Sequence, residues 1–247
     1  MRRRSAGPWS PVKQSPAKRQ QLGSPAKRAT ARHIAADQAS STSGQQGTDL
    51  VAEQQLGVGR LHLIMGPMFA GKTTTLLQRV AEAERSHQRV AIITSALDTR
   101  YGERQCITHT GVARAALPAK ALMPLLRPGG WDIGCYDVIA IDESQFFPDL
   151  KSFCLHAVEA CGKTVIVAGL SGDFERKTFG DVVALVPFAD RVDFLSARCS
   201  FCERPAAFTL RLVASDAQAL VGGKDAYQPV CRSHYKALSN VRSDFVP

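Results

Sequence analysis

Short apolar runs alternate with helix-spaced segments along the middle of the chain. Apolar runs at residues 61–65, 90–94, 137–141 and 164–168 predict buried strands. Residues 74–84, with Leu76, Leu77 and Val80 at helical spacing, and residues 149–160 predict helices, the second closed by Gly162. Strands that alternate with helices are typical of a parallel sheet covered by helices, so we expect an α/β fold.

A glycine-rich loop lies between the first predicted strand and the first predicted helix. Its sequence GPMFAGKT matches the pattern G-x-x-x-x-G-K-[ST], in which glycines let backbone N–H groups converge on an anion. The lysine adds positive charge, and the threonine hydroxyl can bind Mg²⁺. A chance turn is the alternative, but both flanks agree with the pattern, which predicts nucleoside triphosphate binding. The loop residues are Gly66, Pro67, Met68, Phe69, Ala70, Gly71, Lys72 and Thr73.

Two adjacent acids follow the third predicted strand. Asp142, at the end of a buried strand, is the predicted magnesium ligand. If the strand continued, Glu143 would face the opposite side and serve an attacking group, water in a hydrolase or a substrate hydroxyl in a kinase. The alternative is that both acids cap the next segment.

Three cysteines and a histidine form two knuckles in the C-terminal part. Cys199 and Cys202 make a C-x-x-C pair, and Cys231 and His234 make a later C-x-x-H pair, which together predict a tetrahedral structural zinc site. The length between them predicts a projecting loop at about residues 212–227. A redox pair or unrelated thiols are the alternatives. The other four cysteines lack such spacing and are expected to be core or surface thiols: Cys106, Cys135, Cys154 and Cys161.

The charged residues are unevenly distributed along the chain, and this distribution bears on the expected binding partners. The 247 residues, 45% of them apolar, suffice for one sizeable domain, with or without a small appendage. The net charge of +9 arises from residues 1–36, which hold nine Lys or Arg and no acid, and residues 37–247 hold 22 basic and 22 acidic residues. The neutral body gives no reason to expect a nucleic-acid groove. With no membrane-length apolar run, no secretory core and an odd cysteine count, we expect a soluble intracellular protein.

The N-terminal region has the composition of a disordered basic tail. It carries three Ser-Pro-x-Lys repeats, at residues 10–13, 15–18 and 24–27, which resemble sites of proline-directed kinases. An organelle transit peptide, a nuclear import signal at Lys27 and Arg28, and a solvated tail without an address are all compatible with it. The expected division is a tail at 1–56, a P-loop α/β nucleotide-binding domain at 57–195, a zinc-binding lobe with a lid loop at 196–240, and a C-terminal tail at 241–247.

Several motifs, in order and spacing, resemble the cytosolic-type thymidine kinases, the type II, zinc-containing P-loop family. They are GPMFAGKT, DTRY at 98–101, DESQFFPD at 142–149, GLSGDFERKTFG at 169–180, the two knuckles and GGKDAY at 222–227. The resemblance covers about residues 58–240. It implies a P-loop NTPase-type parallel sheet with a small zinc-binding lobe, and transfer of the ATP γ-phosphate to the 5′-hydroxyl of thymidine, giving dTMP and ADP in pyrimidine salvage for DNA synthesis.

The resemblance also implies roles for individual residues. Glu143 falls on the position of the general base, and Arg100 and Arg211 fall on those of arginines near the transferred phosphate. The implied cofactors are ATP, Mg²⁺ and structural Zn²⁺, in a cytoplasmic homotetramer inhibited by dTTP. Phe147 lies outside the implied pocket and is expected in the core. The implied thymidine-binding residues are Met68, Phe146, Leu170, Phe174, Phe179, Thr209 and Tyr227, with the backbone of Val221 and Gly222 in the lid.

Some positions depart from the family pattern. Ser144 replaces the usual glycine after the general base, Thr110 stands where an acid commonly follows Thr-His, and Ser171 and Asp173 alter the loop after Leu170. The last two place the acceptance of deoxyuridine or analogues in doubt. Two other classes remain: a nucleic-acid-stimulated ATPase with a zinc module, which predicts a basic face on the body, and a non-catalytic nucleotide-binding regulator, which predicts a broken loop lysine or base. The neutral body and the intact residues favour the kinase.

Overall fold

The computed structural model describes residues 58–98, 105–107, 113–126 and 133–243. These residues all fall within one compact unit that spans residues 46–247. The expected N-terminal tail with its Ser-Pro-x-Lys repeats lies outside the described residues, as do Arg100 and Thr110.

A six-stranded parallel sheet forms the centre of the nucleotide-binding part. Its order is β5-β2-β6-β7-β1-β8, and each neighbouring pair is parallel. The predicted fold class is therefore confirmed. The strands are β1 (Arg60–Gly66), β2 (Val90–Ser95), β5 (Leu117–Ala119), β6 (Val138–Ile141), β7 (Thr164–Leu170) and β8 (Arg191–Phe194).

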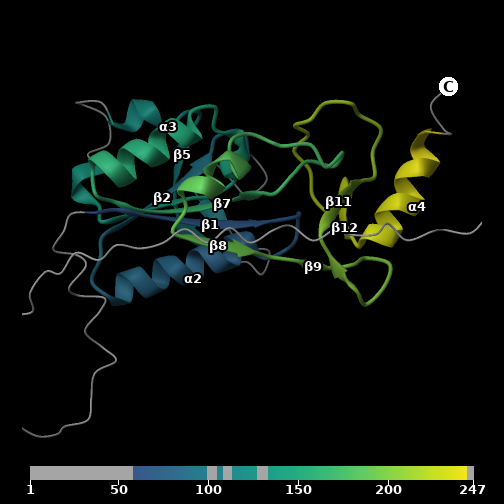
Figure 1. Ribbon diagram of the computed structural model, residues 1–247, viewed down its shortest axis with the longest axis horizontal. Coiled ribbons are helices and arrows are strands. Elements are labelled where there is room, and N and C mark those ends of the chain that lie inside the picture. The colour runs from purple at the N-terminus through teal and green to yellow at the C-terminus, as the bar shows by residue number, and fades with distance from the viewer. Residues whose placement is uncertain (1–57, 99–104, 108–112, 127–132, 244–247) are drawn as a thin grey trace, which may run out of the picture. The chain divides into compact units, whose positions relative to one another are not determined.

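Both faces of this sheet are buried, because successive side chains point to opposite faces. On β7, Val165 and Val167 join one core cluster, and Ile166 and Ala168 join the other. Helix α2 (Lys72–Arg85) covers the second face, and α3 (Leu150–Leu155) covers the first (Figure 1). Phe147 is 1% exposed in the first cluster, which confirms its expected core position.

The second predicted helix is not uniform. The α-helical part ends at Leu155 and a π-helical turn, His156–Ala160, follows, before Gly162 turns the chain with φ 62° toward β7. Short 3₁₀ segments occur at Met123–Leu126, Ile133–Cys135, Ser144–Phe146 and Val183–Phe188. A small hairpin pairs β3 (Gln105–Ile107) with β4 (Ala113–Ala115).

A small lobe follows the sheet. It holds the antiparallel pairs β9 (Ala197–Arg198) with β10 (Pro205–Ala206) and β11 (Phe208–Arg211) with β12 (Tyr227–Val230), and ends in α4 (Arg232–Ser243). Residues 212–226, hereafter the lid, connect β11 to β12 without helix or strand, as the sequence predicts for this loop. In the described part of the chain, no helix has the length and apolar character needed to cross a membrane.

Candidate active site and metal cluster

The glycine-rich loop connects the end of β1 to the start of α2. Gly71 adopts a left-handed conformation with φ 82°, which glycine accommodates without strain, and the helix begins at Lys72. The unpaired N–H groups of a helix start, together with a loop of this kind, attract anions. Lys72 Nζ donates to the carbonyl of Pro67 at 2.8 Å, so its ammonium group lies over the loop. The loop thus has the form that phosphate binding requires.

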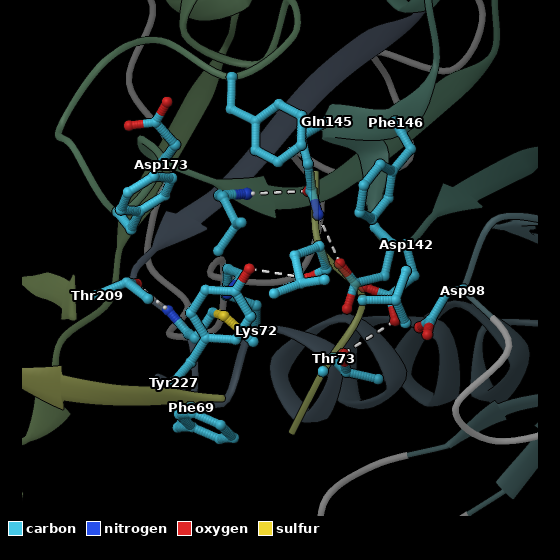
Figure 2. Close-up of a pocket in the computed structure, with 18 of the residues that line it drawn as sticks. Phe69, Lys72, Thr73, Asp98, Asp142, Gln145, Phe146, Asp173, Thr209 and Tyr227 are labelled. Carbon is cyan, nitrogen blue, oxygen red and sulfur yellow. Dashed lines mark hydrogen bonds between the residues drawn. The ribbon is translucent and has the colours of Figure 1, made fainter. Parts of the chain in front are cut away.

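Asp142 lies directly after β6 and faces the loop. Thr73 Oγ1 donates to Asp142 Oδ2 at 2.9 Å (Figure 2), and Cys106 Sγ donates to the same oxygen at 3.3 Å. Burial, followed by the negative charge of Glu143, raises the pKa of Asp142 to about 6, although the two hydrogen bonds oppose the shift. Burial also raises the pKa of the Cys106 thiol, so it stays a neutral donor. A cation at Asp142 would relieve its unfavourable burial.

Glu143 does not continue the strand. The condition under which Asp142 and Glu143 would face opposite sides is not met, because β6 ends at Ile141 and Glu143 is left-handed, with φ 50° and ψ 41°. Both carboxylates therefore line one cavity. The acids do not cap the following 3₁₀ segment through a side chain at Glu143. A left-handed non-glycine residue is costly and is often found at functional sites.

Gln145 holds the Glu143 carboxylate. Its Nε2 donates to Glu143 Oε2 at 2.6 Å, and its Oε1 accepts the Leu170 backbone N–H at 3.2 Å (Figure 2). Gln145 is 3% exposed, so this amide bridges the Glu143 carboxylate and the end of β7 inside the protein. The sequence analysis did not select this residue, although it lies within the DESQFFPD motif at 142–149.

One cavity collects most of the residues that the sequence analysis selected. It is lined by loop, sheet and lobe residues together, namely Met68, Phe69, Gly71, Lys72, Thr73, Asp142, Glu143, Phe146, Leu170, Phe174, Phe179, Thr209, Arg211, Val221, Gly222 and Tyr227. Gly66, Pro67 and Ala70 belong to the loop but do not line this cavity. Lining residues that were not selected include Thr94, Asp98, Cys106, Gln145, Asp173 and Gln218. Asp98 had a signal, since it opens the DTRY motif.

Hydrogen bonds join the cavity to the lobe. Met68 N donates to Thr209 Oγ1 at 3.0 Å, and Tyr235 Oη donates to the Phe174 carbonyl at 2.6 Å. The Phe146 and Phe179 rings pack edge to face, with centroids 5.4 Å apart, and supply an apolar wall.

Arg211 organises the lid. It is 1% exposed, and its N–H groups donate to the carbonyls of Ser215, Ala217 and Gln218 and to the Tyr227 hydroxyl. Its guanidinium carbon lies 3.7 Å from the centroid of the Phe174 ring. The predicted approach of Arg211 to phosphate stays a prediction, since these contacts are all within the protein.

The two predicted knuckles meet in the lobe. The ligand atoms of Cys199, Cys202, Cys231 and His234 all lie within 4.8 Å of one another. His234 Nδ1 is 3.4 Å from both Cys199 Sγ and Cys231 Sγ, and Cys202 Sγ is 3.9 Å from Cys231 Sγ. A tetrahedron with Zn–S bonds of about 2.3 Å has S–S edges of about 3.8 Å, so this donor set fits zinc.

The pKa values of two thiols in this cluster, Cys199 and Cys202, are lowered from the ordinary value by hydrogen bonds from their surroundings. Burial opposes ionisation of Cys199, but backbone N–H groups of Cys231 and Phe201 and the neighbouring thiols lower its pKa to about 7. Thiolates are the form that binds metal. Of the other cysteines, Cys106 and Cys154 are buried, Cys161 is half-buried and Cys135 is exposed, as expected for unclustered thiols.

The parallel sheet, the loop before α2 and the acids after β6 define a P-loop nucleotide-binding enzyme. A family model described as thymidine kinase matches residues 59–235. The chain is 45% identical over 186 residues to thymidine kinase a of Arabidopsis thaliana, covering 74% of this chain and 77% of that protein. It is 48% identical over 182 residues to a thymidine kinase of Oryza sativa subsp. japonica (72% and 66% covered) and 44% identical over 177 residues to the cytosolic thymidine kinase of Homo sapiens (72% and 73% covered).

The chain therefore belongs to the thymidine kinase family, as its motifs indicated, and is an enzyme of that kind. The rival interpretation, a nucleic-acid-stimulated ATPase, finds no support in these comparisons.

Proposed function

We infer that this protein transfers the γ-phosphoryl group of ATP to the 5′-hydroxyl of thymidine, which yields dTMP and ADP. Family membership supports the reaction and its substrate. Within the structure, the observation that carries the inference is one cavity that is lined together by the glycine-rich loop, by apolar side chains, by lid residues and by Glu143.

The loop end is the proposed phosphate site. Backbone N–H groups of residues 66–73 and the Lys72 ammonium group would bind the ATP phosphates. Thr73 and Asp142 would hold Mg²⁺, because a hydroxyl and a carboxylate oxygen 2.9 Å apart are the hard donors that this ion prefers. When bound, the ion neutralises negative charge on the β- and γ-phosphate oxygens.

Glu143 is the proposed general base. Its carboxylate accepts the proton of the 5′-hydroxyl as that oxygen forms a bond to the γ-phosphorus, and the bond from phosphorus to the bridging oxygen of ADP breaks. The hydrogen bond from Gln145 fixes the carboxylate for this step. Arg211 and Arg100 are proposed, from the family resemblance alone, to approach the transferred phosphate.

The far end of the cavity is the proposed thymidine site. Aromatic and aliphatic side chains suit the flat base and its methyl group, and the backbone of Val221 and Gly222 offers polar groups that can recognise the base edge. The lid would exclude water, which could otherwise accept the phosphoryl group.

The remaining proposals concern the metal site of the lobe, the oligomeric state of the protein, its location and its inhibition. The Cys₃His cluster would bind one structural Zn²⁺ and stabilise the lobe that carries the lid. The resemblance further suggests a cytoplasmic homotetramer inhibited by dTTP, with no nucleic acid bound to the neutral body. Sedimentation of the purified protein tests the homotetramer, and titration of its activity with dTTP tests the inhibition.

The general-base assignment is tested with Glu143→Gln. Binding of ATP and thymidine should persist, while kcat falls by about 10²- to 10⁴-fold. Glu82→Gln on the exposed side of α2 makes the same chemical change away from the cavity and should retain wild-type kcat. Full activity of Glu143→Gln would refute the assignment.

A further inference from the structure

A side-chain hydrogen bond joins the lid to the segment that follows β7. Gln218 Nε2, in the lid, donates to Asp173 Oδ2 at 2.7 Å. Asp173 is 6% exposed, and its other oxygen accepts the backbone N–H groups of Glu175 and Lys177 at 2.9 and 2.8 Å. The turn at 173–177 therefore fixes the carboxylate in the direction of the lid. Because the acceptor is an ionised group, this bond is stronger than one between neutral partners.

Gln218 is held from two sides. Its side-chain amide also donates to the Thr178 carbonyl at 3.0 Å, so two hydrogen bonds run from one lid residue to the segment after β7. Its backbone carbonyl accepts a hydrogen bond at 2.9 Å from Arg211, which belongs to β11 of the lobe. Gln218 therefore connects the lid both to Arg211 in the lobe and to the segment that follows β7.

The hydrogen bonds that Arg211 and Tyr227 make with the lid act within the lobe. Arg211 donates to lid carbonyls, and the Tyr227 hydroxyl donates to the Leu220 carbonyl at 2.8 Å. These bonds set the shape of the lid. They do not hold it to the turn at 173–177, which the Gln218 amide does. In Figure 2 Asp173 lies on the same side as Thr209 and Tyr227, two of the residues proposed to contact the nucleoside, and away from Thr73 and Asp98.

We propose that the Asp173–Gln218 hydrogen bond is a latch that keeps the lid closed over the nucleoside and so sets nucleoside affinity. The inference rests on the proposed function, in which Val221 and Gly222 of the same lid contact the base. Lid opening has to break the latch before thymidine leaves, whereas the phosphoryl transfer step occurs at Glu143 with the lid closed. Asp173 and Gln218 are accordingly positioning residues, and their loss should change thymidine affinity more than kcat.

The test uses Gln218→Ala, which removes the amide, and Gln218→Glu, which sets a second carboxylate against Asp173. For Gln218→Ala we expect KM and Kd for thymidine to rise about 3- to 20-fold, through loss of the bond to Asp173 and the exposed bond to the Thr178 carbonyl, with kcat unchanged within about two-fold or raised. Gln218→Glu should have the larger effect, because the two charges repel. Asp216→Asn, at an exposed lid residue two positions away, is the matched control and should behave as wild type.

Two further measurements keep the proposal falsifiable. Asp173→Asn retains an oxygen for the turn, so in a double-mutant cycle it should add little to the KM of Gln218→Ala. Backbone amide exchange in residues 217–222, measured without nucleoside, should be faster in Gln218→Ala than in wild type. Unchanged exchange and unchanged KM in Gln218→Ala, or fully additive effects of the two substitutions, would overturn the latch.

These measurements distinguish a failure of the latch proposal from a failure of the proposed function. If the wild-type protein formed no dTMP, the proposed function would fail, while amide exchange of the lid would still decide the latch. If wild type formed dTMP and Gln218→Ala matched it in both measurements, only the latch would be wrong.

Discussion

Gln145 Nε2 lies 2.6 Å from Glu143 Oε2, so a buried amide fixes the carboxylate that we assign as the general base. The other end of the same amide accepts the Leu170 N–H, and Leu170 lines the proposed thymidine site. The position of the base is therefore linked to the wall that receives the nucleoside.

Removal of this link should reduce turnover. For Gln145→Ala we expect kcat to fall about 10- to 100-fold, because a carboxylate displaced by about 1 Å loses alignment with the hydroxyl. The KM for ATP should change little, since Gln145 does not contact the glycine-rich loop in the described hydrogen bonds. Steady-state kinetics with each substrate varied separately checks this. An equal loss in kcat/KM for both substrates with unchanged kcat would contradict the positioning role.

The raised pKa of Asp142 has a consequence for stability. Between about pH 4 and 6 the folded state binds the Asp142 proton more tightly than the unfolded state, so this group lowers the free energy of unfolding as the pH rises through that window. Above pH 6 Asp142 is ionised in both states, and the full loss in the free energy of unfolding is present. In the absence of divalent metal, Asp142→Asn should therefore raise the free energy of unfolding at pH 7.5, on the order of 1 to 3 kcal/mol, and much less at pH 4.

Urea unfolding of Asp142→Asn and wild type at both pH values, in EDTA, measures this difference. The same substitution should abolish Mg²⁺-dependent turnover, because it removes the carboxylate proposed to bind the ion. A variant that is less stable than wild type at pH 7.5 would show that Asp142 is not destabilising in the folded protein.

Ser144 and Gly169 form a tight contact behind the base. Ser144 is fully buried, and its hydroxyl oxygen is one of two buried side-chain polar atoms without a hydrogen-bond partner among the described residues. A Cβ at Gly169 would lie 2.3 Å from Ser144 Oγ and 2.8 Å from Val182 Cγ2. We expect Gly169→Ala to lower the free energy of unfolding by about 1 to 3 kcal/mol, through overpacking.

The Ser144 hydroxyl should account for part of the destabilisation expected for Gly169→Ala. Ser144→Ala removes an unsatisfied hydroxyl and should leave stability unchanged or raise it by up to about 1 kcal/mol. The double variant Ser144→Ala/Gly169→Ala should be more stable than Gly169→Ala alone, because the closest clash, with the Ser144 hydroxyl, is gone and the remaining contacts with Val182 and Gln145 are less close. Calorimetric unfolding of the four proteins tests the coupling, and strictly additive effects would argue against it.

The Cys₃His cluster should hold zinc that the lobe needs. We expect about one zinc per chain in wild type and its loss in Cys202→Ser, with a lower Tm. Thymidine binding should weaken strongly in this variant, since the lid belongs to the lobe, while ATP binding at the glycine-rich loop persists. Cys135→Ser, at an exposed cysteine outside the cluster, is the control and should keep its zinc. Retention of zinc in Cys202→Ser would exclude the proposed ligand set.

The four inner strands and the glycine-rich loop could be predicted because each strand is a continuous apolar run flanked by helical spacing. The two outer strands, β5 and β8, could not. β5 has three residues, and β8 is largely exposed, so neither shows an apolar run.

The chemistry of the site was less accessible than its location. The knuckles and the loop are local patterns, whereas the position of Glu143 depends on a left-handed backbone conformation that no residue type at 143 signals. Gln145, Asp173 and Gln218 gain their significance from contacts that form only in the folded chain; Asp173 and Gln218 are 45 residues apart. Long-range polar contacts of this kind leave no periodic trace in a sequence.

The most direct test of the proposed reaction is a phosphoryl-transfer assay with the purified protein, ATP and Mg²⁺. Thymidine, deoxyuridine, deoxycytidine or no nucleoside is offered, each with and without single-stranded DNA, and both nucleoside monophosphate and ADP are measured. We expect dTMP from thymidine in amounts equal to ADP, little product from deoxycytidine, and no effect of DNA. ADP formation that requires DNA and proceeds without nucleoside would contradict the account.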